Sequence, residues 1–219
     1  DSSTSRGLGD VYKRQPGDLG SMMVSSGTPG SQTMSRLSIF PDGSTSMDQS
    51  SPTPLLVTGT PAEIQAELAQ RGIGFEQWPA LQELPLAADQ SWILKAYAND
   101  IERVKRDGGY ATVDAIRMTP DHPERVAMRS KFLAEHTHAE DEVRFFVEGR
   151  GLFCLHLGAE VLLTLCERGD LIRVPAGTKH WFDMGSQPAF CAVRWFNNTV
   201  GWVATFTGNT IAERFPKLD

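Results

Sequence analysis

The sequence predicts a mainly β fold in which antiparallel strands form a barrel or sandwich and α-helices occupy the N-terminal part. Beyond residue 135 the chain consists of short runs of Val, Phe, Leu, Ile and Trp separated by Gly, Pro and Asn, which is typical of closely spaced antiparallel strands. Between residues 34 and 131 apolar residues recur at helical spacing. The chain of 219 residues, 40% of them hydrophobic, is long enough for one domain with a buried core.

Residues 1–33 differ in composition from the rest of the chain. They are rich in Ser, Gly, Thr and Pro without apolar periodicity, and they lack the long apolar core of a secretory signal. We expect a disordered or non-native leader, with the native start at Met34. A transit peptide fits less well, because arginines are few and acidic residues are present. A single domain is then expected over residues 34–219, with a helix-rich part over 34–131 and the barrel core over 132–219.

Three helices and one strand are expected before the barrel core. Thr60-Pro61-Ala62-Glu63 predicts a helix start, because a hydroxyl caps the first turn, proline fits the first helical position and a glutamate follows three residues after the cap. Gly72 would end this helix. A second helix is expected from Asp89 to Arg106, a strand from Ala111 to Met118, and a third helix from Pro123 to Phe132. Their apolar stripes predict core packing.

Seven short strands are expected in the C-terminal half of the chain. Leu157-Gly158-Ala159-Glu160 fits a tight hairpin turn between two of them. So many strands at such close spacing indicate a barrel or a sandwich. The expected strands lie near residues 142–148, 151–157, 160–166, 170–174, 180–184, 190–196 and 202–207.

The charge of the chain argues against two classes of partner. There are 27 acidic and 21 basic side chains, a formal net charge of -6, and no basic run, so we expect neither nucleic acid nor an anionic membrane as a partner. No apolar stretch approaches the roughly 20 residues that span a bilayer. Cys154, Cys166 and Cys191 form no CxxC pair, and they predict buried thiols in a reducing compartment.

One cluster of residues has the composition of a metal site. In His136-Thr137-His138 the two histidines alternate along a strand and share one face, and Glu142 has the same parity. The segment Gly169-x5-Pro175-x-Gly177-x2-His180 offers a third imidazole behind a tight bend. Imidazoles and a carboxylate that meet at one point are suitable ligands for a first-row divalent metal.

Other interpretations of these histidines remain open. An HxH pair alone is weak evidence, and such residues are often surface or packing residues. The co-occurrence of the pair, the glutamate and the second segment in this order favours metal binding. His122 precedes a proline at a helix entry and His156 lies in an expected strand, so we assign both to structural roles.

The two segments resemble the two sequence motifs of the cupins, small jelly-roll β-barrels that hold a metal in the barrel mouth. Ser130 and Met184 depart from the residues common in that superfamily. The strings EHTHAEDEVRFFVEGRGLFCLH, VPAGTKHWFDMG and GWVATFTG are more specifically similar to the acireductone dioxygenase family of methionine salvage. The resemblance covers residues 34–219 and is densest from Phe132 to Gly208.

The resemblance implies an enzyme that oxidises acireductone, a 1,2-dihydroxy-3-keto-pentene with a methylthio group, using O2. It implies one Fe(II) or Ni(II) per chain, with His136, His138, Glu142 and His180 as ligands and two positions left for a chelating substrate. With iron the products are 4-methylthio-2-oxobutanoate and formate. With nickel they are 3-methylthiopropanoate, formate and carbon monoxide.

Arg144 has the parity of Glu142 and is expected to point into the same cavity, where a guanidinium would stabilise an enediol dianion. The resemblance also assigns this position to dianion formation. A solvated or ion-paired arginine is the alternative. For Glu135 and Asp141, whose parity is opposite, the resemblance suggests metal incorporation and relay of conformational change, and plain surface acids are the alternative.

Aromatic side chains are expected to hold the methylthio tail and to exclude water. Phe132, Phe182 and Trp202 match aromatic positions of the family, although each is also compatible with ordinary barrel core. Trp181 and Phe145 point the other way and are expected in the core.

The sequence therefore predicts a monomeric, cytoplasmic, metal-dependent acireductone dioxygenase. Another metal cupin, such as a different dioxygenase or a manganese decarboxylase, is one alternative. A cupin that holds a metal without turnover is a second, and a metal-free structural barrel is a third. The ligand set does not select among Fe(II), Ni(II), Co(II) and Mn(II).

Overall fold

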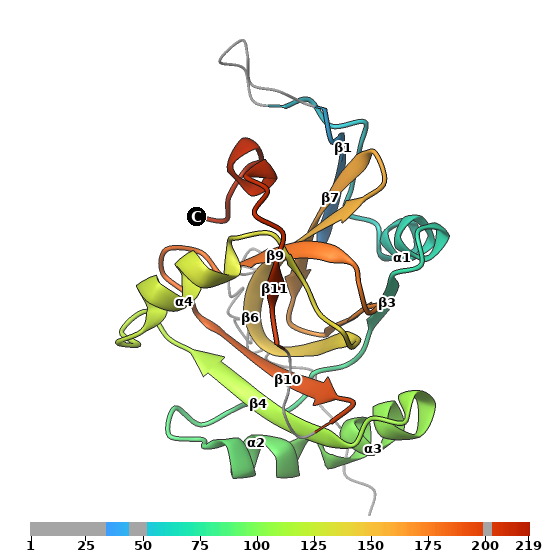
Figure 1. Ribbon diagram of the computed structural model, residues 1–219. Coiled ribbons are helices and arrows are strands. Elements are labelled where there is room, and N and C mark those ends of the chain that lie inside the picture. The colour runs from blue at the N-terminus through green and yellow to red at the C-terminus, as the bar shows by residue number, and fades with distance from the viewer. Residues whose placement is uncertain (1–33, 44–51, 199–202) are drawn as a thin grey trace, which may run out of the picture. The chain divides into compact units, whose positions relative to one another are not determined.

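The structure, a computed structural model, describes residues 34–43, 52–198 and 203–219 (Figure 1). The leader expected over residues 1–33 lies outside the described residues. The helices are α1 (Pro61–Gln70), α2 (Gln90–Ala96), α3 (Ala98–Gly108), α4 (Arg125–Phe132) and the 3-10 helix η1 (Ile211–Arg214). The strands are β1 (Arg36–Pro41), β2 (Leu56–Thr58), β3 (Gly74–Gln77), β4 (Thr112–Met118), β5 (His136–Thr137), β6 (Glu142–Leu157), β7 (Glu160–Glu167), β8 (Asp170–Val174), β9 (Lys179–Asp183), β10 (Phe190–Phe196) and β11 (Thr205–Phe206).

Two antiparallel sheets share strand β6. The first sheet has the order β11-β5-β9-β6-β7-β1-β2, and the second has the order β4-β10-β6-β8-β3. The first half of β6 pairs with β8 and β10, and the second half pairs with β7 and β9. The two sheets enclose one apolar interior. The predicted mainly β fold with antiparallel strands and additional helices is confirmed.

The two strands expected over 142–148 and 151–157 are one strand, so this prediction is wrong. Gly149 has a φ of +63°, and a Cβ at this position would lie 1.8 Å from the carbonyl oxygen of Ala189. The register with β10 also shifts just before this glycine, between the pairs Ala192–Phe146 and Cys191–Glu148. The chain therefore bends at Gly149 and passes into the other sheet instead of ending. The expected hairpin after Leu157 is confirmed, since Leu157 pairs with Glu160.

The sequence analysis did not predict three strands of the N-terminal part, β1, β2 and β3. β1 lies between β7 and β2, and β3 pairs with β8. β2 and β3 have only three and four residues, too few for a clear alternation of apolar and polar residues. Long-range pairing defines these strands, so their local sequence carries little signal.

The helix expected after Thr60 is α1, although its cap differs from the expectation. The Thr60 hydroxyl makes no capping hydrogen bond. The hydroxyl of Thr58 instead donates to Glu63 at 2.5 Å. Gly72 follows the helix with a φ of +78°, as expected for a terminating glycine.

The single helix expected over 89–106 is two helices, α2 and α3, that meet at Tyr97 (φ −107°, ψ 23°). The buried Tyr97 ring packs edge-on against Phe145, with the ring centroids 5.8 Å apart. The apolar stripe therefore continues across the break, which explains why the sequence suggests one helix. Both helices lie beside β4 and β10 (Figure 1) and share a hydrophobic cluster with their outer face. The third expected helix, α4, begins at Arg125.

Side chains alternate strictly along the first half of β6. Val143, Phe145 and Val147 pack against the helices, whereas Phe146 faces the interior. Trp181 packs on the outer side of the first sheet with η1, so the core positions predicted for Phe145 and Trp181 are confirmed. All three cysteines are buried free thiols, also as predicted. Of the helices in the described part of the chain, none has the length and apolar character needed to cross a membrane.

Candidate metal centre and substrate cavity

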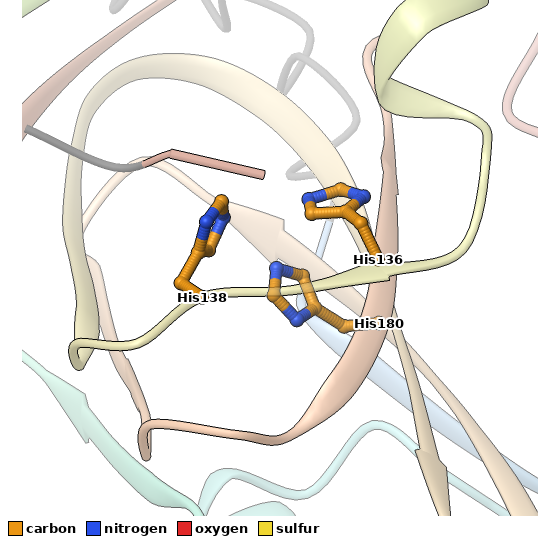
Figure 2. A group of neighbouring side chains, drawn as sticks. All are labelled: His136, His138 and His180. Carbon is orange, nitrogen blue, oxygen red and sulfur yellow. The ribbon is translucent and has the colours of Figure 1, made fainter. Parts of the chain in front are cut away.

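Three buried imidazoles meet inside the barrel (Figure 2). His136 lies in β5, His138 follows that strand, and His180 lies in β9, directly opposite His136 in the ladder. One ring nitrogen of each histidine lies within 4.8 Å of those of the other two. The turn before His180 is tied to the same place, because the N–H of Gly177 donates to the carbonyl of His138 at 2.8 Å. The two sequence segments therefore form one site.

Each of the three rings is oriented by a backbone carbonyl. The Nδ1 atoms of His136, His138 and His180 lie 2.7, 3.1 and 2.8 Å from carbonyl oxygens of Ala134, Val203 and Thr178. A carbonyl only accepts, so each Nδ1 carries the hydrogen and each neutral ring keeps its lone pair on Nε2. Such bonds to the second ring nitrogen are typical of histidines that ligate metals.

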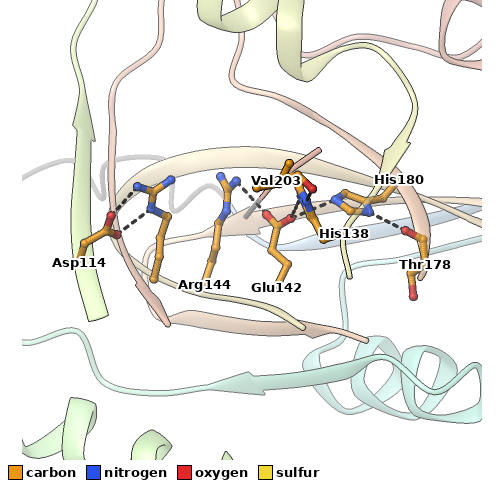
Figure 3. A network of polar contacts seen from close by, with 8 residues as sticks. Asp114, His138, Glu142, Arg144, Thr178, His180 and Val203 are labelled. Atoms are coloured by element: carbon orange, nitrogen blue, oxygen red, sulfur yellow. Dashed lines mark hydrogen bonds and ion pairs between the residues drawn. The ribbon is translucent and has the colours of Figure 1, made fainter. Parts of the chain in front are cut away.

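Glu142, at the start of β6, supplies a buried carboxylate to this group (Figure 3). Its Oε2 lies 3.0 Å from Nε2 of His180 and 3.2 Å from Nε2 of His138. Its Oε1 lies 2.8 Å from Nη2 of Arg144. Burial opposes ionisation, but the Arg144 guanidinium and the contacts with the two histidines hold the pKa of Glu142 well below its usual range. The carboxylate is therefore anionic.

The donor set fits a divalent metal ion. Two Nε2 lone pairs face an ionised carboxylate, and their repulsion is relieved by a metal ion between them or, without a metal, by a proton on Nε2. Without a metal, burial lowers the pKa of His136 to about 4, whereas at His180 burial is outweighed by Glu142 and the pKa is raised. Adjacent ligands of an octahedral ion with bonds of about 2.1 Å are roughly 3 Å apart, close to the distances from Glu142 to the two histidines.

Arg144 lies beside this group, as its parity with Glu142 predicts. The side chain is 6% exposed, and its Cζ lies 4.6 Å from the ring centroid of Phe182 and 5.2 Å from that of Phe153. Burial lowers the pKa of Arg144, an effect that the Glu142 carboxylate opposes. Because the usual value is far above neutrality, the guanidinium stays charged. The site thus holds a fixed cation next to the imidazoles.

These polar groups open onto a cavity of about 290 Å³. Phe132 from α4 and Phe182 from β9 line it, with ring centroids 6.5 Å apart. The third expected aromatic, Trp202, lies outside the described residues. The cavity is also lined by residues that the sequence analysis did not select, namely Asp114, Lys131, Arg194, Phe196, Ala204 and Phe206.

The pair Arg194–Asp114 is the most informative of these omissions. Arg194 donates from Nε and Nη2 to the Asp114 carboxylate at 2.8 and 2.7 Å, and the two residues are directly opposed in the β4–β10 ladder. Phe190 and Ala192 of β10 face the interior, so the strand period places Arg194 on the inner face as well. A charged residue on the inner face of an otherwise apolar strand was the sequence signal that could have identified Arg194 as a residue of the cavity.

Glu135 and Asp141 both accept hydrogen bonds from residues outside the metal group. Glu135 is buried and accepts hydrogen bonds from His156 and Thr207, so the surface-acid alternative is wrong for this residue. Asp141 accepts from the N–H of Ala176 at 3.0 Å. This hydrogen bond attaches the turn before His180 to the segment between His138 and Glu142. The structural role expected for His122 is confirmed by its ring, whose Nδ1 accepts from the N–H of Glu124 at the start of α4.

Comparison with known proteins identifies one family. The family described as "ARD/ARD' family" matches residues 45–204. The acireductone dioxygenase of Synechococcus sp. (strain CC9902) is 95% identical over 186 residues, which are 85% of this chain and 100% of that protein. The acireductone dioxygenase of Parasynechococcus marenigrum (strain WH8102) is 72% identical over the same shares of both chains.

A solved structure agrees with these sequence relatives. The acireductone dioxygenase from Bacillus anthracis, determined with a cadmium ion in its active centre, superposes with a TM-score of 0.66 at 27% identity. The alignment covers 79% of this chain and 98% of that one. The match of the family over residues 45–204, together with these relatives, shows that this chain belongs to the acireductone dioxygenase family.

Proposed function

We propose that this protein is a metal-dependent dioxygenase that cleaves acireductone with O2, with His136, His138, Glu142 and His180 as the metal ligands. The observation that carries the proposal is the convergence of three imidazoles, held by backbone carbonyls in one tautomer, on an anionic Glu142 in a cavity. The three relatives named above are acireductone dioxygenases, and the matching family carries the same name, which supports the same substrate here.

The charges of the site suit an anionic enediol. A bound divalent ion would supply Lewis acidity, which favours the deprotonated substrate. Its two positive charges and that of Arg144, less the single negative charge of Glu142, leave an excess of two that a substrate dianion neutralises. Arg144 is fixed by its contact with Glu142 and by the rings of Phe153 and Phe182, so it contributes this charge without reorganisation.

The aromatic side chains of the cavity suit the remaining part of the substrate. Phe132 and Phe182 provide apolar surface near the histidines, and Trp202 is proposed to extend it from its place in the sequence. Apolar walls bind a methylthio tail and keep water from a reactive carbanion-like centre. Arg194 and Asp114 lie at the same cavity and neutralise each other.

We propose Fe(II) or Ni(II), one per chain, as the metal. Iron would direct the reaction to 4-methylthio-2-oxobutanoate and formate, and nickel to 3-methylthiopropanoate, formate and carbon monoxide. The place in methionine salvage, the cytoplasmic location, the monomeric state and the supporting roles of Glu135 and Asp141 in metal incorporation and conformational relay stay predictions. The single domain over residues 34–219 also stays a prediction.

The test combines metal analysis with product identification. Purified protein should contain close to one equivalent of iron or nickel and should consume O2 with synthetic acireductone. His180→Ala should lose both metal and activity, because it removes one of four ligands. His122→Ala is the matched control, since that histidine bonds to the N–H of Glu124 before α4 and is not part of the metal group. Full metal content and full oxygen consumption in His180→Ala would show that the ligand assignment is wrong.

A further inference from the structure

The carboxylate of Glu135 is buried on the side of β5 away from the metal group. Its Oε1 accepts from Nδ1 of His156 at 2.6 Å, and its Oε2 accepts from the hydroxyl of Thr207 at 2.5 Å. The side chain of Glu135 has no exposed surface. A buried carboxylate needs such donors to remain charged, so His156 and Thr207 together fix its position.

Thr207 is connected to Glu135 a second time, through the backbone. The N–H of Thr207 donates to the carbonyl of Glu135 at 3.1 Å. The Thr207 hydroxyl in turn accepts from the N–H of Asn209 at 3.2 Å. Thr207 is therefore the point at which the segment after β11 is attached to the residue that precedes His136.

β11 depends on this attachment more than an ordinary strand would. It has two residues, both exposed, and within the described ranges it pairs with β5 alone. Its Phe206 lies opposite His136 in the ladder, with the two ring centroids 5.8 Å apart, and also lines the cavity. A two-residue ladder is marginal on its own, so the bonds of Thr207 to Glu135 hold Phe206 against His136.

We propose that His156 is a positioning residue for the metal centre. Its Nδ1–H holds the Glu135 carboxylate, the carboxylate holds Thr207, and Thr207 keeps Phe206 packed over the solvent side of His136. His156 lies in the second half of β6, and Glu142 lies at the start of the same strand. One end of β6 therefore supplies Glu142, and the other end holds His136 in place through Glu135, Thr207 and Phe206. The inference rests on the proposed function only in taking His136 as a metal ligand.

Removing the His156 donor should weaken the contacts from Glu135 to Thr207 and from Phe206 to His136 without unfolding the rest of the protein. In His156→Leu the buried carboxylate loses a charge-assisted hydrogen bond, and such bonds are strong enough for their loss to change a local equilibrium about tenfold or more. Thr207→Val breaks the next bond in the chain at an exposed residue, where the fold tolerates the change. His156→Asn returns an amide N–H near the position of Nδ1 and should restore part of the effect.

The experiment compares the single variants with the double variant His156→Leu/Thr207→Val, and the parent and His122→Leu serve as controls. Two quantities are measured on Co(II)-loaded protein without substrate: the hydrogen exchange rate of the Thr207 amide and the rate of metal loss to a chelator. The proposal expects both rates to rise about tenfold in each single variant, with no further rise in the double variant. His122→Leu should match the parent.

Two results would overturn the proposal. One is an unchanged exchange rate at Thr207 in His156→Leu, and the other is a double variant whose effects add, since additive effects mean that His156 and Thr207 act independently. If His156→Leu does not fold, Thr207→Val and His156→Asn carry the same comparison. Failure of the parent to bind Co(II) would count against the proposed function, while the exchange rate at Thr207 in the metal-free variants would still decide the positioning role.

Discussion

Asp183→Asn should destabilise the protein by about 3 kcal/mol, because it breaks a buried ion pair without changing the shape of the side chain. Asp183 is 1% exposed and accepts from Nε and Nη2 of Arg129 at 2.7 and 3.0 Å. It also accepts from the N–H groups of Gly185 and Leu218, both at 2.9 Å. This one carboxylate thereby joins β9, α4 and the C-terminal segment.

The size of the effect follows from comparison with an exposed pair. Lys105 and Glu102 lie 3.6 Å apart on the surface of α3, with the glutamate side chain 62% exposed, and such pairs contribute roughly 0.5 kcal/mol or less. In Asp183→Asn the amide presents a donor to the Arg129 guanidinium, whose side chain is 20% exposed, so that a partly buried charge is left without its counter-ion. The expected difference between the two sites is therefore about sixfold in free energy.

Urea unfolding of the metal-free protein measures this difference. With a typical dependence on urea of about 1.5 to 3 kcal/mol per molar, a loss of about 3 kcal/mol lowers the midpoint by about 1 to 2 M. Glu102→Gln, the matched carboxylate-to-amide change, should leave the midpoint nearly unchanged. A shift in Asp183→Asn no larger than that of Glu102→Gln would refute the reasoning.

Three further predictions follow from the site, the bend in β6 and the buried thiols. Arg144→Met should keep one metal per chain but raise the KM for acireductone at least tenfold, and ultraviolet spectra of the anaerobic complex should lack the dianion band; an unchanged spectrum would remove Arg144 from substrate ionisation. Gly149→Ala should abolish soluble folded protein, as seen by circular dichroism, because a Cβ would lie 1.8 Å from the Ala189 carbonyl oxygen; native-like stability would contradict the described bend. The thiols should not react with a disulfide reagent in native protein and should all react in urea, because burial raises their pKa values, to about 12 for Cys191. Since unfolded thiols ionise near pH 8.5, the free energy of unfolding should fall as the pH rises from about 9 towards 12, and a flat profile after allowance for the other groups would be inconsistent with this burial.

The proximity of the three histidines and Glu142 was predictable because it depends on short-range pattern. His136, His138 and Glu142 lie within seven consecutive residues, and the tight bend before His180 is visible as Pro175 and Gly177. Strand parity then placed Arg144 beside Glu142, and the distance of 2.8 Å between them agrees. The sequence did not reveal which backbone carbonyls fix the histidine tautomers. These carbonyls belong to loop residues, and one of them, Val203, is 65 residues away from His138.

Features that depend on distant partners were not predictable in the same way. The break between α2 and α3 leaves the apolar stripe intact, so periodicity alone suggests a single helix. Gly149 looked like the end of a strand because glycine separates elements more often than it bends one. His156 was assigned a structural role, and only the coordinates reveal Glu135, 21 residues earlier, as its partner.

The carbonyl groups that hold the three imidazoles have a consequence for metal exchange. The lone pairs are aimed at one point by the protein itself, so an arriving ion meets a cage that is already assembled and its replacement requires no refolding. Competing ions would then be ranked by intrinsic ligand affinity, which rises from manganese through iron and cobalt to nickel, and by their abundance in the cell. Under the proposed function, the balance between the two sets of products would be decided by metal supply and not by any rearrangement of the polypeptide.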